Sequence, residues 1–199
     1  MAGDKYIPFV KELLRGQADE SPEFGEYEFE LFDDLGSMIS TIKQKDEEHG
    51  LSRVIAGYAW PWNSKGPKKR HKIDIDEDGV KLQWNGVVKD WINSPGSVSE
   101  VGSIHTVQGY DLNYAGVIIG RDLRMDPSDG AVYFDRSNYY DKKGKENNKK
   151  LGITYTDEDI LQYVQNIYSV LMTRGIRGTY LYVCDETLRE YMRSKIRTR

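Results

Sequence analysis

Apolar residues recur every three or four positions in three segments of the chain, with polar residues between them. This spacing predicts helices over residues 5–15, from about 34 to 50, and from 157 to about 171. A short helix from about 186 is predicted to close the chain. Local start and stop signals support these bounds. The signals are Gly16, Asp33 or Asp34, Gly50, the capping-box pair Thr156 and Asp159, and Asp185.

Between the helices, apolar residues either alternate with polar ones or form short unbroken runs, as they do in strands. Tyr27, Phe29 and Leu31 alternate with glutamates, which predicts a strand with one wet face. Short apolar runs predict further strands at 54–58, 101–105, 116–120 and 179–184. Helices that alternate with strands are typical of an α/β fold, here with a mainly parallel sheet covered by helices.

Two segments interrupt this alternation. Residues 59–98 hold all four tryptophans and several turn dipeptides, so we interpret them as an insertion with short strands near 72–76 and 80–84. The lysine- and asparagine-rich stretch at 141–150 is predicted to be a mobile loop. With 199 residues, of which 38% are apolar, residues 1–199 are expected to form one domain.

Composition excludes several classes of protein. No apolar run approaches the ~18 residues that a membrane span requires, and the mixed charges of the first residues are unlike a signal peptide. Cys184 is the only cysteine, so an internal disulfide is excluded and a reducing cytoplasm fits best. The three histidines have no metal-ligand spacing, so no metal site is predicted. Asp74, Asp76 and Asp78 precede Gly79 as in a calcium loop, but a polar edge strand and turn accounts for them better.

Positive charge is concentrated in two places, although the formal net charge is -4. One run includes Lys68 and Lys69, and the other lies within 142–150. Such runs attract phosphates, and they are also typical of solvated loops. Trp60 and Trp62 flank Pro61 just before the first run, as in grooves that stack the bases of single-stranded nucleic acids. Core packing is the alternative role of these aromatic side chains.

Two further segments have the chemistry of a phosphate site. Residues 104–111 (IHTVQGYD) lie between two predicted strands, where a glycine-containing turn exposes backbone amides to a ligand. Residues 171–178 (LMTRGIRG) place two arginines at a helix end, and the planar guanidinium binds phosphate oxygens well. By themselves these patterns also fit an ordinary turn and a helix end that favours cations.

In this order, the two segments resemble motifs V and VI of superfamily I helicases. More closely, the chain resembles a family of Schlafen-like P-loop ATPases across essentially its whole length. The segments that carry this likeness are RVIAGYAWPW (53–62), VGSIHTVQGYDLNYAGVIIG (101–120) and YSVLMTRGIRGTYLYVCD (168–185). The resemblance implies a RecA-like domain of the P-loop NTPase type, with helices on both faces of the sheet.

The resemblance also implies roles for individual residues. Arg174 matches the motif VI arginine that contacts the γ-phosphate as an arginine finger. Gln108 and Gly109 match positions near the nucleotide phosphates, and Asp111 matches an acidic ribose contact that is more commonly Glu. Arg177 has no assured counterpart and ranks below Arg174 as a nucleotide contact.

On the nucleic-acid side, the resemblance implies that His105 and Thr106 lie next to the backbone of DNA or RNA. Trp60, Trp62, Lys68 and Lys69 complete the predicted nucleic-acid contacts.

The chain departs from the family pattern because no GxxxxGK[ST] sequence occurs in it, and no acidic pair of the Walker B type precedes its motifs. We therefore expect it to bind ATP and Mg²⁺ only together with an N-terminal P-loop domain, in the same parent protein or in a separate chain. The predicted function is the C-terminal half of an ATP-dependent helicase or translocase, which does not hydrolyse ATP alone. The alternative is a non-catalytic module of the same fold that binds nucleic acid or protein.

Overall fold

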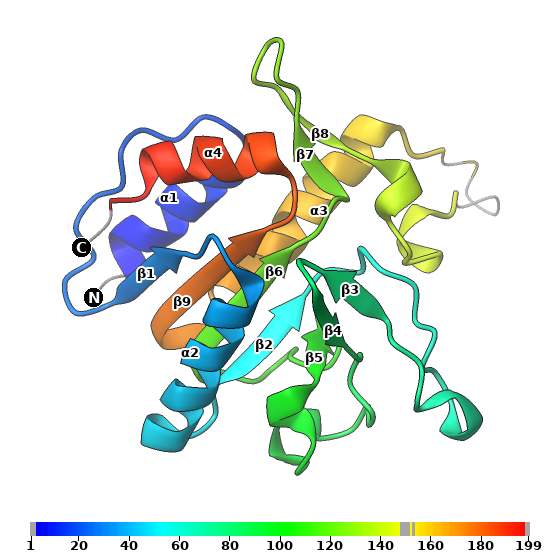
Figure 1. Ribbon diagram of the computed structural model, residues 1–199. Coiled ribbons are helices and arrows are strands. Elements are labelled where there is room, and N and C mark those ends of the chain that lie inside the picture. The colour runs from blue at the N-terminus through cyan, green and yellow to red at the C-terminus, as the bar shows by residue number, and fades with distance from the viewer. Residues whose placement is uncertain (1–2, 148–151, 153, 198–199) are drawn as a thin grey trace.

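A single parallel sheet forms the centre of the molecule. The computed structural model describes residues 3–147, 152 and 154–197. Five strands run parallel to one another in the order β1-β9-β6-β2-β5 (Figure 1). Their bounds are β1 Glu28–Leu31, β2 Arg53–Ala56, β5 Val101–Ser103, β6 Leu112–Ile119 and β9 Gly175–Val183. The inner strands β2 and β6 are almost wholly buried, as is β9 from Gly178 onward, as expected for a sheet covered on both faces.

Helices cover both faces of this sheet. Helix α2 (Leu35–His49) packs on one face, in front of the sheet in Figure 1, through Leu35, Met38, Ile39 and Ile42. Helices α1 (Gly3–Leu14), α3 (Asp157–Met172) and α4 (Glu186–Lys195) share the core of the other face. The α/β class and the mostly parallel sheet predicted from sequence are thereby confirmed, and the arrangement is that of a RecA-like domain. Within the described residues, no helix is both long enough and apolar enough to cross a membrane.

The predicted start and stop signals lie at the helix ends. The Asp34 carboxylate accepts a hydrogen bond from Ser37 N and starts α2, which ends at Gly50. Thr156 and Asp159 form the reciprocal capping box of α3. Asp185 caps α4 by accepting from Leu188 N. These local interactions satisfy backbone groups that a helix end would otherwise leave unpaired.

Residues 59–98 form no strand of the central sheet. They contain the antiparallel hairpin of β3 (Ile75–Glu77) and β4 (Val80–Leu82), which turns at Asp78 and Gly79. The short helical turns η1 (Pro67–Lys69) and η2 (Trp91–Asn93) also lie within the segment, and η3 (Ser97–Ser99) lies at its end. Arg53 at the start of β2 is buried and donates to Ser97 Oγ and Ile92 O, which anchors the end of the segment to the sheet.

Several bounds differ from those predicted. Strand β6 begins at Leu112 rather than 116, and β9 begins at Gly175 rather than 179, because backbone pairing between the two strands extends past their apolar runs. The predicted strand at 101–105 ends at Ser103. The strands predicted near 72–76 and 80–84 correspond to β3 and β4, which are shorter than predicted.

The prediction also missed a hairpin. Strands β7 (Leu123–Met125) and β8 (Val132–Phe134) pair in antiparallel fashion and project beyond the carboxyl end of the central sheet (Figure 1). In the predicted mobile loop at 141–150, residues 143–145 form the short turn η5 (Lys143–Lys145). Residues 148–150 of that prediction lie outside the described residues.

Candidate functional site

The turn at residues 104–111 runs from one end of the parallel strands to the other. It leaves β5 where the strands end, which we call the carboxyl edge, just after Ser103. It enters β6 where the strands begin, which we call the amino edge, at Leu112. Thr106 is buried, and its hydroxyl donates to Ser103 O while accepting from Ser103 N. Gly109 has φ +84°, a conformation that residues with a Cβ rarely adopt. The two ends of the turn therefore face two different surfaces of the molecule.

At the amino edge, the turn lies against Arg174. The Arg174 backbone carbonyl accepts from Leu112 N at 2.9 Å. Its guanidinium Nη1 lies 3.4 Å from the carbonyl oxygen of Tyr110 and 3.8 Å from Oδ1 of Asp111. Gln108 and Gly109 are exposed beside this contact. The structure thus brings Arg174 next to the turn that holds Gln108, Gly109 and Asp111, from which it is far apart in sequence.

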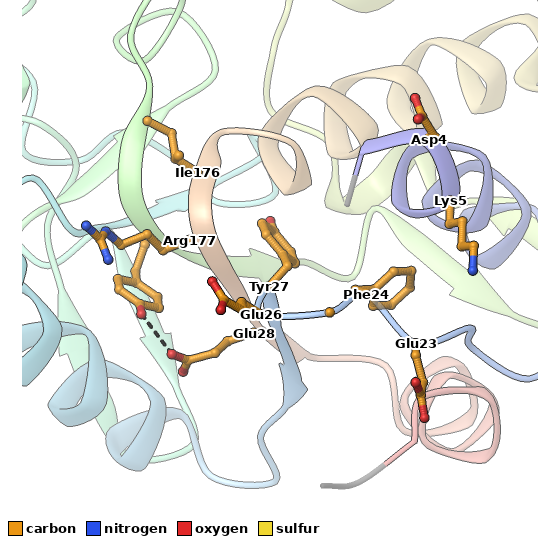
Figure 2. Close-up of a pocket in the computed structure, with 11 residues that line it drawn as sticks. Asp4, Lys5, Glu23, Phe24, Glu26, Tyr27, Glu28, Ile176 and Arg177 are labelled. Carbon is orange, nitrogen blue, oxygen red and sulfur yellow. Dashed lines mark hydrogen bonds between the residues drawn. The ribbon is translucent and has the colours of Figure 1, made fainter. Parts of the chain in front are cut away.

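Arg177 lies apart from this group. It lines a hollow of about 730 Å³ together with Glu28, Tyr114 and Ile176, near the start of β1 (Figure 2). The Glu28 carboxylate accepts hydrogen bonds from Tyr114 at 2.8 Å, from Lys45 at 3.1 Å and from Tyr180. Burial alone would raise the pKa of Glu28, but the bonds from Tyr180, Tyr114 and Lys45 together lower it. This network links Glu28 of β1 to α2 through Lys45, and to β6 and β9 through Tyr114 and Tyr180.

At the carboxyl edge, aromatic and basic side chains line a groove of about 510 Å³. Trp60, Trp62 and His105, three of the predicted nucleic-acid contacts, meet there. The rings of Tyr58 and His105 lie 5.6 Å apart, and the Lys65 ammonium lies 5.2 Å from the Trp62 ring centroid. We call this the aromatic groove; its lining residues are Tyr58, Trp60, Pro61, Trp62, Lys65, His105, Tyr140, Asp141, Lys142 and Lys143.

The other predicted nucleic-acid contacts lie outside the aromatic groove. Thr106 follows His105 but is buried, with its hydroxyl bonded inside the turn, so only its neighbour faces the groove. Lys68 and Lys69 form η1 in the adjoining loop, where both are exposed. The sequence prediction missed Tyr140 as a groove residue, and no local pattern signals it, because it comes from a distant loop.

A buried carboxyl group, that of Asp122, lies just after the carboxyl end of β6. Tyr168 donates to Oδ1 of Asp122 at 2.6 Å, and its hydroxyl accepts from Gly120 N at 3.0 Å. Asp122 is only 1% exposed. Burial raises its pKa to about 7, although the hydrogen bond from Tyr168 opposes the shift. Within the described residues, no group of three or more potential metal ligands lies together.

Comparison with known proteins identifies the family. A family model described as Schlafen group 3, DNA/RNA helicase domain, matches residues 1–185. The chain belongs to the Schlafen group 3 helicase-domain family. It is also 34% identical over 192 residues to the uncharacterized protein YPL245W of Saccharomyces cerevisiae. That match covers 94% of the chain but 41% of the yeast protein, so this Schlafen-type domain spans about two fifths of its relative's length.

Family membership confirms the resemblance to Schlafen-like helicases that the motifs indicated. It makes this chain a helicase-related domain. The roles of individual residues, and the binding of a nucleotide or a nucleic acid, are inferred from the geometry at the two edges.

Proposed function

We propose that this domain is the second motor domain of an ATP-dependent helicase or translocase. In this proposal, Arg174 and the turn Gln108–Asp111 complete an ATP site whose other wall is a P-loop domain. The observation that carries it is the guanidinium of Arg174 beside an exposed, glycine-containing turn at one edge of the sheet. A planar guanidinium offsets the charge that develops on a transferring phosphoryl group.

The fit to a nucleotide rests on three features of this edge. Arg174 retains 23% of its side-chain exposure; its Nε and Nη1 donate to the carbonyl oxygens of Val170 and Tyr110, and Nη2, which bonds to no described residue, is the nitrogen offered to a ligand. Gly109 leaves open space where other residues have a Cβ, because nothing lies within 4 Å of that position. Asp111 is exposed and offers a carboxylate to a ribose hydroxyl. Arg177 lines another hollow and is left out of the proposed site.

The phosphate-binding loop and the ligands of Mg²⁺ are assigned to the partner domain, because the sequence of this chain has no GxxxxGK[ST]. Bound Mg²⁺ would neutralise charge on the β- and γ-phosphates. Arg174 would approach the γ-phosphate from the opposite side of the cleft, and closure of the cleft would position it.

The aromatic groove is proposed to hold a single-stranded segment of DNA or RNA. Its clustered aromatic rings and the cations Lys65, Lys142 and Lys143 match the two contacts that such strands offer, bases and phosphates. His105 in the groove and Gln108 at the opposite edge belong to one turn. Movement of this turn on ATP binding would therefore also move His105, and with it the contact to the nucleic acid.

A second candidate function is a nucleic-acid-binding module that uses no ATP. The separation of the aromatic groove from Arg174 favours it, because the groove is complete within this chain.

The two functions are distinguished by ATP turnover of the protein encoded by the full parent reading frame, measured with and without single-stranded DNA or RNA. Turnover stimulated by nucleic acid supports the motor domain. Oligonucleotide binding without turnover supports the binding module.

A further inference from the structure

A second hollow adjoins the aromatic groove, on the other side of Trp62. It has a volume of about 400 Å³, within the range of about 300–1,000 Å³ usual for small-ligand sites. Trp62 and Lys65 line both hollows, so a strand in the groove passes the mouth of the second one. Its walls are the basic loop at 64–70 and the loops at 85–88 and 94–96.

Glu100 supplies a carboxylate to this hollow. Its Oε2 accepts from Gly86 N at 2.9 Å and from Trp91 Nε1 at 2.7 Å. Its Oε1 accepts no hydrogen bond within the part of the chain that the structure describes. A Cβ at Gly86 or Gly96 would lie 2.8 or 3.1 Å from Oε1. Glycine at these two positions therefore leaves the free oxygen uncovered.

Two buried residues also line the hollow. Trp84 and Asn85 are at least 98% buried. Trp84 Nε1 and Asn85 Oδ1 have no partner among the described residues, but both atoms are inaccessible to solvent. A ligand in the hollow therefore meets the carboxylate of Glu100 rather than these two atoms.

Two of the lining loops, which we call the lips of the hollow, differ in character. Lys65 and Arg70 come from one lip, and Val87 and Val88 from the other. Val88 is 72% exposed, which is unusual for valine. Cations on one lip suit a phosphate, and apolar side chains on the other suit the flat face of a base. A nucleotide is the ligand class that has an anionic group, an apolar face and a polar edge together.

We infer that this hollow is a subsite for one unstacked base that carries an exocyclic amino group, while the neighbouring base stacks in the aromatic groove beyond Trp62. The inference rests on the proposed binding of single-stranded nucleic acid. Adenine, cytosine and guanine each present an amino donor to the free oxygen of Glu100. Thymine and uracil instead present carbonyl oxygens on both sides of their single N–H, and the carboxylate repels these.

The experiment compares three oligonucleotides that differ in one central base or in the amino group of that base. They are an oligothymidylate, the same strand with one central adenine, and the same strand with purine, in which hydrogen replaces the amino group. Dissociation constants are measured by fluorescence anisotropy on the full chain. We expect the adenine strand to bind about 5- to 100-fold more tightly than the other two. In Glu100→Gln, this preference should shrink, because an amide donor replaces the free oxygen and the charge that repels thymine carbonyls is removed.

A second variant guards against a folding defect in Glu100→Gln. Val88→Asp changes an exposed side chain at the lip, and it should also reduce the adenine preference while the melting temperature is unchanged. Equal affinity for adenine and purine strands, or a preference that survives both substitutions, overturns the inference while leaving the groove intact. Failure of all three strands to bind overturns both the inference and the proposed nucleic-acid function.

Discussion

The guanidinium Nη1 of Arg174 lies 3.8 Å from the carboxylate Oδ1 of Asp111. Asp111 keeps 69% of its side-chain exposure, so water screens this ion pair and its contribution to stability is small, about 0–1 kcal/mol. A phosphate oxygen can therefore replace the carboxylate at little cost. The guanidinium is held at the mouth of the proposed site by the backbone carbonyls of Val170 and Tyr110, which accept from its Nε and Nη1.

We expect Arg174→Ala to abolish ATP turnover by the full parent protein, with a loss of about 10³- to 10⁵-fold in kcat. The removed group would be the one that offsets charge on the γ-phosphate. The measurement is phosphate release at saturating ATP and nucleic acid.

Arg197→Ala is the matched control for this substitution. Arg197 is another surface arginine with a carboxylate partner, Glu20 at 2.8 Å, but it lies near the end of the chain, outside the proposed site. It should leave turnover close to wild type. Full turnover by the Arg174 variant would refute its role as an arginine finger.

Trp62→Ala should weaken binding of single-stranded oligonucleotides by about 5- to 100-fold, because it removes a stacking surface from the aromatic groove. Quenching of tryptophan fluorescence on titration gives the affinity, and the affinity should fall as salt rises. Tyr133→Ala is the control, since Tyr133 is a similarly exposed ring on β8. If both variants bind like the wild type, the groove is not a stacking surface.

Local signals were sufficient to predict much of the fold. Asp34, Thr156 and Asp185 each bond to backbone within a few residues, so the helix starts can be recognised without knowing the rest of the structure. The alternation of helix and strand likewise predicts the parallel sheet, because parallel strands need a crossover connection. Ends of strands were harder, since β6 and β9 are extended by pairing with each other.

Long-range packing decides what sequence patterns leave open. All four tryptophans fall in one segment, and the sequence pattern alone does not separate core rings from surface rings. The structure buries Trp84 and Trp91 to at least 99%, while Trp60 and Trp62 line the aromatic groove. Trp91 packs on Gly102 of β5, and the sequence of the segment does not indicate where that strand lies. The buried pair, Trp84 and Trp91, can therefore be told from the groove pair, Trp60 and Trp62, only in the folded structure.

Gly102→Ala should destabilise the domain by about 1–3 kcal/mol or more. A Cβ at this position would lie 2.3 Å from the Trp91 ring, in a core that has no room to relax. Gly36→Ala is the matched control: this glycine lies in the first turn of α2, where a new Cβ would lie 3.3 Å from the Asp34 carboxylate oxygen, an exposed side-chain atom that can shift. Alanine should cost much less there than at Gly102. Chemical denaturation measures both, and equal stability of the two variants would contradict the tight packing of Trp91 on β5.

Stability should depend on pH through Asp122. Burial raises the pKa of this carboxyl group from 3.8 to about 7, so the folded state binds its proton more tightly than the unfolded state does. The stabilisation is therefore complete below about pH 4 and is lost as pH rises through about 7. Asp122→Asn keeps an oxygen to accept from Tyr168 but cannot ionise.

The variant should consequently gain stability relative to wild type as pH rises from 5 to 8, by an amount on the order of a few kcal/mol. Other carboxylates change stability in both proteins equally, so the difference between the two unfolding free energies isolates residue 122. Asp76→Asn removes an exposed carboxylate and controls for net charge. A difference that does not vary with pH would show that Asp122 keeps its charge in the folded protein. The hydrogen bond from Tyr168 at 2.6 Å would then outweigh the cost of burial.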